Sequence, residues 1–174
     1  MFRAMGHEQV AILNGGLPAW LDAGYPLTNT PPEIPARGNF VARYQAGLFC
    51  DAETVLIALQ DNASTVLDAR AAGRFSGQEA EPREGLRSGH MPGAKNLPFT
   101  DLLDNGYMRP TEALKARLAA LATPDQQLIF SCGSGVTACH LALAATLSGY
   151  SKLSVFDGSW SEWGARPELP IARD

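Results

Sequence analysis

The sequence predicts an α/β fold in which helices cover both faces of a mainly parallel central sheet. Short apolar runs alternate along the chain with amphipathic, helix-forming segments, the order of elements that builds such a sheet. The run 127–130 is short and apolar, as expected for a strand buried on both faces. Asp68 and Cys132 directly follow two such runs, and open parallel sheets bind ligands at that edge. We therefore expect a functional site at the carboxyl ends of the strands.

The composition is that of an ordinary globular protein. The chain has 174 residues, of which 45% are hydrophobic, enough to bury a sizeable core. Its net charge of −4 argues against a general nucleic-acid binder. No apolar run approaches membrane-spanning length, and residues 1–30 lack a secretory-signal pattern. Three cysteines fit neither a disulfide framework nor a paired metal site, so we expect a cytoplasmic protein without a metal, with Cys50 and Cys139 packed in the core.

Residues 1–27 have the pattern of the end of a domain rather than of its start. The stretch Gly6–Trp20 has the same order as Gly149–Trp163: glycine, polar spacer, apolar strand, Asx-Gly turn and a helix bearing tryptophan. One offset of 143 residues aligns the two, which indicates duplication, and chance similarity is the alternative. We expect residues 1–27 to end a first domain, with roughly a hundred residues preceding this chain. Residues 28–38 then form a proline-containing linker, and residues 39–174 form the second domain.

The second domain begins with elements that lead to a long polar loop. In chain order, the patterns predict a half-exposed strand over 40–44, a helix over 51–59 capped by Asp51, a buried strand over 65–70, a polar loop over 71–92, a strand over 94–98 and a helix over 111–121. Asp68 and Arg70 are interpreted as a structural ion pair rather than as substrate contacts. A loop this long is more often functional than idle, and its arginines suit carboxylate binding; a solvated mixed-charge surface is the alternative.

Cys132 lies in a tight turn between the strand predicted over 127–130 and a helix predicted over 136–147. Gly133 and Gly135 allow positive φ, so that successive N–H groups can point inward and form an anion-binding nest at the helix start. The pKa of a cysteine at such a position falls from about 8.5 toward about 3.5–7.5, which makes it a thiolate nucleophile. A small buried apolar side chain is the alternative. The flanking glycines and hydroxyl residues favour the reactive thiol.

Four motifs occur in order along the second domain. They are Val66-Leu67-Asp68-Ala69-Arg70, Gly89-His90-Met91-Pro92-Gly93-Ala94, Cys132-Gly133-Ser134-Gly135-Val136-Thr137 and Asp157-Gly158-Ser159-Trp160. Together they resemble the rhodanese family of sulfurtransferases. On this resemblance, residues 40–170 correspond to the catalytic second domain of a tandem protein, and residues 1–27 to the end of its inactive first domain. The resemblance implies a rhodanese-like fold, which is an α/β arrangement of the kind inferred above from the strands and helices.

The resemblance also implies a substrate and a mechanism. The neutral loop is similar to that of 3-mercaptopyruvate sulfurtransferases, whereas thiosulfate-preferring members carry basic residues after the cysteine. The cysteine attacks the sulfur of the small-molecule donor and becomes a persulfide; a thiol acceptor, such as a thioredoxin-like protein, or cyanide then takes the sulfur, and no cofactor is required. Arginines hold the donor carboxylate, and a serine moves the proton of its thiol. The implied catalytic residues are Cys132 and Ser134, and the implied substrate-binding residues are Arg74, Arg83, Gly133, Gly135, Val136 and Thr137.

Three alternative functions stand beside this one. A thiosulfate-preferring sulfurtransferase differs only in the donor. A non-catalytic rhodanese-like binding module usually lacks the cysteine, which is present here as Cys132. Cysteine phosphatases on a related fold need an arginine that closes a Cys-x5-Arg loop, and that position is Ala138. The 3-mercaptopyruvate sulfurtransferase is therefore the expected function.

Overall fold

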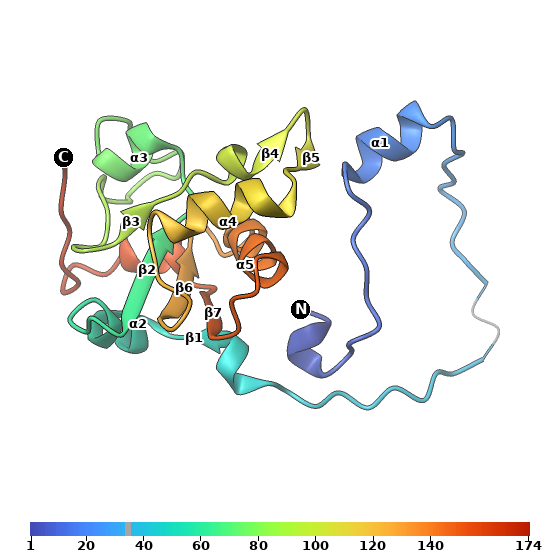
Figure 1. Ribbon diagram of the computed structural model, residues 1–174, viewed down its shortest axis with the longest axis horizontal. Helices are drawn as coiled ribbons and strands as arrows, with labels where there is room; N and C mark the ends of the chain where they lie inside the picture. The colour runs from blue at the N-terminus through green and yellow to red at the C-terminus, as the bar shows by residue number, and fades with distance from the viewer. Residues whose placement is uncertain (34–35) are drawn as a thin grey trace.

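The α/β fold predicted from the sequence is confirmed by a computed structural model, which describes residues 1–33 and 36–174 (Figure 1). The strands are β1 (Phe49–Cys50), β2 (Ser64–Asp68), β3 (Lys95–Asn96), β4 (Leu103–Asp104), β5 (Tyr107–Met108), β6 (Gln127–Ser131) and β7 (Leu153–Phe156). The helices are α1 (Gly16–Asp22), α2 (Ala52–Ala58), α3 (Ala72–Ser76), α4 (Thr111–Ala119), α5 (Ala138–Leu147) and α6 (Ser159–Trp163). Short 3-10 turns cover Arg3–Met5, Ala46–Leu48 and Phe99–Leu102.

The central sheet has five strands in the order β1-β7-β6-β2-β3, and every pairing in it is parallel. β4 and β5 form a separate antiparallel pair. β6 lies between β7 and β2, so the loop that begins at Cys132 leaves the sheet near the middle of its carboxyl edge. The chain therefore places this loop between the ends of two neighbouring strands, where residues from three segments can meet.

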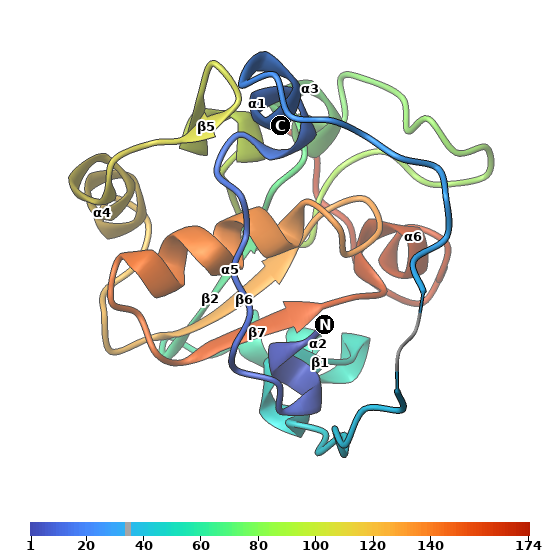
Figure 2. The same ribbon diagram turned by 90° about the vertical axis from the view of Figure 1, so that its right-hand side faces the viewer.

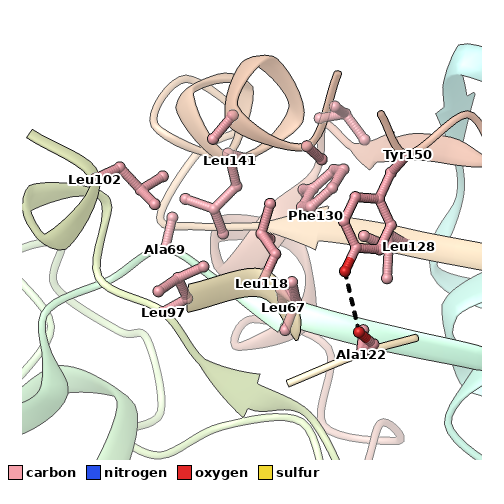
Figure 3. Close-up of a cluster of buried hydrophobic side chains, with 14 of the residues drawn as sticks. Leu67, Ala69, Leu97, Leu102, Leu118, Ala122, Leu128, Phe130, Leu141 and Tyr150 are labelled. Carbon is pink, nitrogen blue, oxygen red and sulfur yellow. Dashed lines mark hydrogen bonds between the residues drawn. The ribbon is translucent and has the colours of Figure 1, made fainter. Parts of the chain in front are cut away.

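Each face of the sheet carries its own hydrophobic core. Figure 2 shows α5 on one side of the strands and α2 on the other. α4 and α5 cover one face, and Figure 3 shows their cluster, in which the buried Tyr150 hydroxyl donates to Ala122 O at 3.1 Å. α2 and α6 cover the other face, where the side chains of Trp160 and Trp163 are fully buried. Full burial of a large apolar side chain contributes about 1.5–3 kcal/mol, so these two tryptophans fix α6 firmly against the sheet.

The helix predicted over 51–59 is present as α2, and its N-terminus is capped as expected. Asp51 Oδ1 accepts hydrogen bonds from Thr54 N at 2.9 Å and from the Thr54 hydroxyl at 2.6 Å. This cap satisfies a backbone N–H group that has no partner within the helix. Val55 lies on the buried side of α2, so the amphipathic pattern of the sequence also has the expected orientation.

Three elements differ from the sequence-based prediction. Residues 40–44 are exposed and form no strand, because β1 occupies the sheet edge beside β7 that they would need. The predicted loop 71–92 contains α3, which buries Phe75. α5 begins at Ala138 rather than at residue 136, because residues 136–137 form a turn that completes the loop after β6.

Residues 1–27 lie apart from the two cores. In Figure 1, α1 stands beside the β4–β5 pair, and Met108 N donates to Asn14 Oδ1 at 2.8 Å. The apolar side chains of α1 stay open to solvent: Leu17 is 56% exposed and Leu21 is 49% exposed. This segment therefore presents an apolar surface that nothing in the described residues covers.

The two segments related by 143 residues share local structure. α1 begins at Gly16 and α6 at Ser159, and both residues have positive φ, of 60° and 49°. Trp20 Nε1 donates to Pro26 O at 3.1 Å, and Trp163 Nε1 donates to Pro170 O at 2.8 Å. The strand that precedes the turn forms only in the second segment, as β7, because residues 10–13 have no neighbouring strand.

The predicted linker 28–38 is exposed over residues 28–33 and 36–38, and residues 34 and 35 lie outside the described residues. Among the helices of the described chain, none combines the length and the apolar character needed to cross a membrane.

Candidate active site

The loop from Cys132 to Thr137 forms the floor of a cavity at the carboxyl edge of the sheet, with a volume of about 260 Å³. Helix α3 contributes Arg74 to the opposite wall, and the polar loop that follows α3 contributes Arg83. Seven of the eight predicted site residues line this cavity: Cys132, Gly133, Ser134, Val136, Thr137, Arg74 and Arg83. The eighth, Gly135, lies in the same loop. Residues far apart in the sequence thus meet around one thiol.

The Cys132 thiol lies at the bottom of the cavity. The residue is 1% exposed, yet it lines the cavity, so a small molecule can reach it only from that side. Burial raises the pKa of the thiol, but hydrogen bonds from the Thr137 hydroxyl and from the backbone N–H groups of Ser134 and Ala138, with the Ser159 hydroxyl nearby, outweigh burial and bring the pKa below its ordinary value. The predicted nest of N–H groups therefore faces the sulfur and favours the thiolate.

Gly135 makes the turn of the loop possible. Its φ of 79° lies in the left-handed region, and a Cβ at this position would come within 2.7 Å of Asp157 O. The expectation of positive φ at Gly133 is wrong: positive φ occurs in this loop at Gly135 alone. Gly133 has another reason to be small, since a Cβ there would lie 3.1 Å from Arg74 Nη2. Its absence leaves room for the guanidinium beside the loop.

The first turn of α6 holds the loop from below. Ser159 Oγ accepts hydrogen bonds from Cys132 N at 3.1 Å and Gly135 N at 3.0 Å, and it donates to Phe156 O at 2.7 Å. Trp160 N donates to Cys132 O at 3.0 Å. Because these contacts use the loop groups that point away from the cavity, the remaining N–H groups are left to face Cys132 Sγ.

Sequence reasoning missed the role of α6, although it singled out the motif Asp157–Trp160. The motif itself is visible in the sequence, but its place beside the cysteine loop depends on β7 being parallel and adjacent to β6, so that both strands end at the same edge. Ser159 also has a positive φ of 49°, unusual for a residue other than glycine. Strained residues of this kind concentrate at functional sites, where surrounding contacts hold them in place.

Arg74 belongs to a buried network of charges. Glu81 Oε2 accepts a hydrogen bond from Arg74 Nη2 at 2.5 Å, and Glu81 Oε1 accepts one from Arg70 Nη1 at 2.8 Å. Arg70 also pairs with Asp68 at 2.7 Å and stacks on the Trp160 ring at 4.1 Å, as expected for a structural pair. Glu81 was not singled out in the sequence. It neutralises part of the charge that Arg74 brings to the cavity.

Arg83 has a different environment. It is exposed at the mouth of the cavity, and its Nη1 donates to Ser161 Oγ at 2.6 Å. Within residues 1–33 and 36–174, no carboxylate forms a salt bridge with it. Its full positive charge is thus available to an anionic ligand.

The other two cysteines do not belong to this cavity. Cys50 is half-buried against the core beneath α2, and burial raises the pKa of its thiol to about 11. The expectation that Cys139 packs in the core is wrong: it is exposed on the first turn of α5, where Sγ lies 3.4 Å from Gly135 O. Its position seven residues after Cys132 does not bring it inward, because the helix begins only at Ala138.

The site holds no arrangement typical of a metal centre. In the described part of the chain, no three His, Cys, Asp or Glu side chains gather as metal ligands would. His90 is buried, stacks on Phe75 at 4.0 Å between ring centroids, and hydrogen-bonds through Nδ1 to Phe75 O at 2.9 Å. His90 therefore has a structural environment.

A parallel α/β sheet that presents a thiolate-favouring cysteine loop between a strand end and a helix defines a class of cysteine-dependent group-transfer proteins. The family model of the Rhodanese-like domain matches residues 51–166, and the chain belongs to this family. The resemblance inferred from the four motifs is confirmed at the level of the family.

The similar proteins include both 3-mercaptopyruvate and thiosulfate sulfurtransferases. The chain is 40% identical over 172 residues to 3-mercaptopyruvate sulfurtransferase of Escherichia coli (strain K12), covering 98% of this chain and 61% of that protein. It is 42% identical over 179 residues to 3-mercaptopyruvate sulfurtransferase of Homo sapiens, covering 99% and 59%. It is also 42% identical over 178 residues to thiosulfate sulfurtransferase of Cricetulus griseus, covering 99% and 60%. The chain thus spans about 60% of the length of these relatives.

Solved structures support the fold. The Tum1 protein of Saccharomyces cerevisiae superimposes with a TM-score of 0.79 at 29% identity, covering 99% of this chain and 63% of that one. A structure of an EanB variant in complex with ergothioneine gives a TM-score of 0.87 at 24% identity, covering 98% and 43%. At that identity the second similarity concerns the fold alone.

Proposed function

We propose that this chain is the catalytic part of a sulfurtransferase that takes sulfur from 3-mercaptopyruvate and carries it as a persulfide of Cys132. One observation carries the proposal: N–H groups of Ser134 and Ala138 and the Thr137 hydroxyl surround a thiol whose pKa is lowered although it is buried. A thiolate at the bottom of a small cavity is a nucleophile that only a small donor can reach.

The reaction follows from this arrangement. Cys132 Sγ forms a bond to the donor sulfur while the carbon–sulfur bond of the donor breaks, and its electron pair leaves with pyruvate as the enolate. The loop N–H groups stabilise the developing negative charge. The proton of the donor thiol ends on the pyruvate methyl group, and in this proposal the hydroxyl of Ser134, a residue that lines the cavity, transfers it. The enzyme is left as a Cys132 persulfide anion.

The charges around the cavity favour a keto acid over thiosulfate. The loop itself has no basic side chain, and the two arginines on the opposite wall supply the positive charge. Glu81 offsets part of the charge of Arg74, which leaves Arg83 as the principal partner for a carboxylate. This balance suits the single negative charge of 3-mercaptopyruvate better than the two of thiosulfate. The relatives include both enzymes, so the loop rather than identity supports the choice.

The acceptor and the domain organisation complete the proposal. A thiol, such as that of a thioredoxin-like protein, or cyanide takes the outer sulfur and returns Cys132 to the thiolate. Residues 39–174 form the catalytic domain, residues 28–38 the linker and residues 1–27 the end of a first domain; the shared offset of α1 and α6 supports this division. Three unpaired cysteines suit a reducing compartment, so we place the protein in the cytoplasm.

Mass spectrometry of the intact protein tests the proposal. After incubation with 3-mercaptopyruvate, Cys132 should gain about 32 Da, and dithiothreitol should remove that mass. The variant Cys132→Ser is the control and should gain nothing, whereas Cys139→Ser should behave as the parent. A parent protein that stays unmodified would instead favour a non-catalytic binding module. Faster sulfur release from thiosulfate than from 3-mercaptopyruvate would reject the donor assignment while keeping the reaction class.

A further inference from the structure

Ser161, on the first turn of α6, touches both the cysteine loop and an arginine of the opposite wall. Its backbone N–H donates to Gly133 O at 2.9 Å, and its hydroxyl donates to the same oxygen at 2.5 Å. Because the single hydroxyl proton is committed to Gly133 O, Ser161 Oγ can only accept from its other neighbour. That neighbour is Arg83 Nη1, at 2.6 Å. The hydroxyl thus has a fixed direction, set by the loop.

Arg83 needs such an anchor more than Arg74 does. Arg74 is held by two hydrogen bonds to Glu81, a side chain that is 2% exposed. Arg83 sits on an exposed stretch of the polar loop, and within the described residues the hydrogen bond to Ser161 is the contact that orients its guanidinium. A free arginine side chain populates many rotamers, and a ligand that fixes them loses binding free energy. Anchoring by a neutral hydroxyl fixes the arginine without cancelling its charge.

We propose that Ser161 is a positioning residue that holds the Arg83 guanidinium over the cavity and so sets the affinity of the site for carboxylate-bearing donors. The part of this inference that concerns donors rests on the proposed function. Ser161 differs in this from Ser159, whose hydroxyl contacts the N–H groups of Cys132 and Gly135. Within one helical turn, Ser159 thus orients the cysteine loop and Ser161 orients Arg83.

Alkylation of Cys132 tests the inference without any need for sulfur transfer. Iodoacetate and iodoacetamide react with the same thiolate, but only iodoacetate carries a carboxylate, so the ratio of their rates at the Cys132 peptide reports on Arg83. Mass spectrometry of that peptide separates it from the exposed Cys139. We expect Ser161→Ala to lower the iodoacetate-to-iodoacetamide ratio about three- to tenfold. Ser161→Thr keeps the hydroxyl and should restore the ratio.

The double variant decides whether Ser161 acts through the arginine. If it does, Arg83→Ala lowers the ratio by itself, and adding Ser161→Ala lowers it no further. The pH profile of iodoacetamide alone should stay unchanged in Ser161→Ala, because the Ser161 backbone N–H still holds Gly133 O. Each of three results would overturn the inference. The first is an unchanged iodoacetate-to-iodoacetamide ratio in Ser161→Ala, and the second is that Ser161→Ala lowers this ratio as much in the Arg83→Ala protein as in the parent. The third is a shifted pH profile of iodoacetamide alkylation in Ser161→Ala.

A kinetic measurement connects the inference to turnover. With 3-mercaptopyruvate as donor, Ser161→Ala should raise KM about three- to tenfold and leave kcat within about twofold of the parent. A fall in kcat at constant KM would contradict a positioning role through Arg83. If the parent protein transfers no sulfur, the proposed function fails, and the alkylation ratio still decides whether Ser161 orients Arg83.

Discussion

Replacing Gly135 by alanine should both destabilise the folded protein and raise the pKa of the Cys132 thiol. An alanine at φ 79° costs about 1–2 kcal/mol in the left-handed region. Its Cβ would lie 2.7 Å from Asp157 O, a backbone atom that cannot rotate away, so the loop must move and strain the hydrogen bond from Gly135 N to Ser159 Oγ. Losing that bond costs about 0.5–1.5 kcal/mol. The free energy of unfolding should therefore fall by about 1.5–3.5 kcal/mol.

Gly133→Ala provides the matched control in the same loop. Its φ is not positive, and the nearest atom to a Cβ is Arg74 Nη2 at 3.1 Å, the end of a flexible side chain. We expect a loss below about 1 kcal/mol in urea unfolding. The alkylation of Cys132 by iodoacetamide should shift to higher pH in Gly135→Ala and much less in Gly133→Ala. Equal stability losses in the two variants, or a parent-like thiol pKa in Gly135→Ala, would refute the argument from backbone geometry.

Three further predictions concern single side chains. Ser159→Gly removes the hydroxyl without adding backbone strain, so the pKa of Cys132 should rise. The alkylation rate of the Cys132 peptide at pH 7 should then fall about three- to tenfold. An unchanged rate would show that Ser159 does not orient the cysteine loop. Glu81→Ala deprives the buried Arg70 of one partner and should cost about 3 kcal/mol in urea unfolding, whereas a loss under 1 kcal/mol would contradict this. Burial raises the pKa of the Cys50 thiol from 9.0 to about 11, so between these pH values the unfolded chain holds fewer protons than the folded protein. The free energy of unfolding should therefore fall with rising pH over this range, by about 1–2 kcal/mol for this half-buried thiol. Cys50→Ala should flatten that part of the pH–stability profile.

The sequence predicted the centre of the site because its residues are contiguous. An apolar run, a turn of small residues and a helix identify a strand–loop–helix unit, and the loop 132–137 lies where such a unit places it. The pairing of Asp68 with Arg70 could also be inferred, since the two residues lie two positions apart where β2 ends.

The contacts that hold the cysteine loop in place could not be predicted from the sequence in the same way. Ser159 meets Cys132 across 27 positions, and the contact depends on β7 lying next to β6, which local patterns do not specify. Glu81 is one of several carboxylates in a polar loop, and only the folded chain singles it out as the partner of Arg70 and Arg74. Residues 40–44 alternate like a strand but lack a free sheet edge, because tertiary pairing overrides local propensity.

The dependence of the Cys132 loop on α6 has a consequence for the order in which the protein matures. The nucleophile is synthesised before the serines that orient its surroundings, so a nascent chain that has reached the end of α5 carries the thiol without its brace. Domains fold as units while synthesis proceeds from the N-terminus. The cysteine loop can therefore reach its braced conformation only after α6 has been synthesised and has docked.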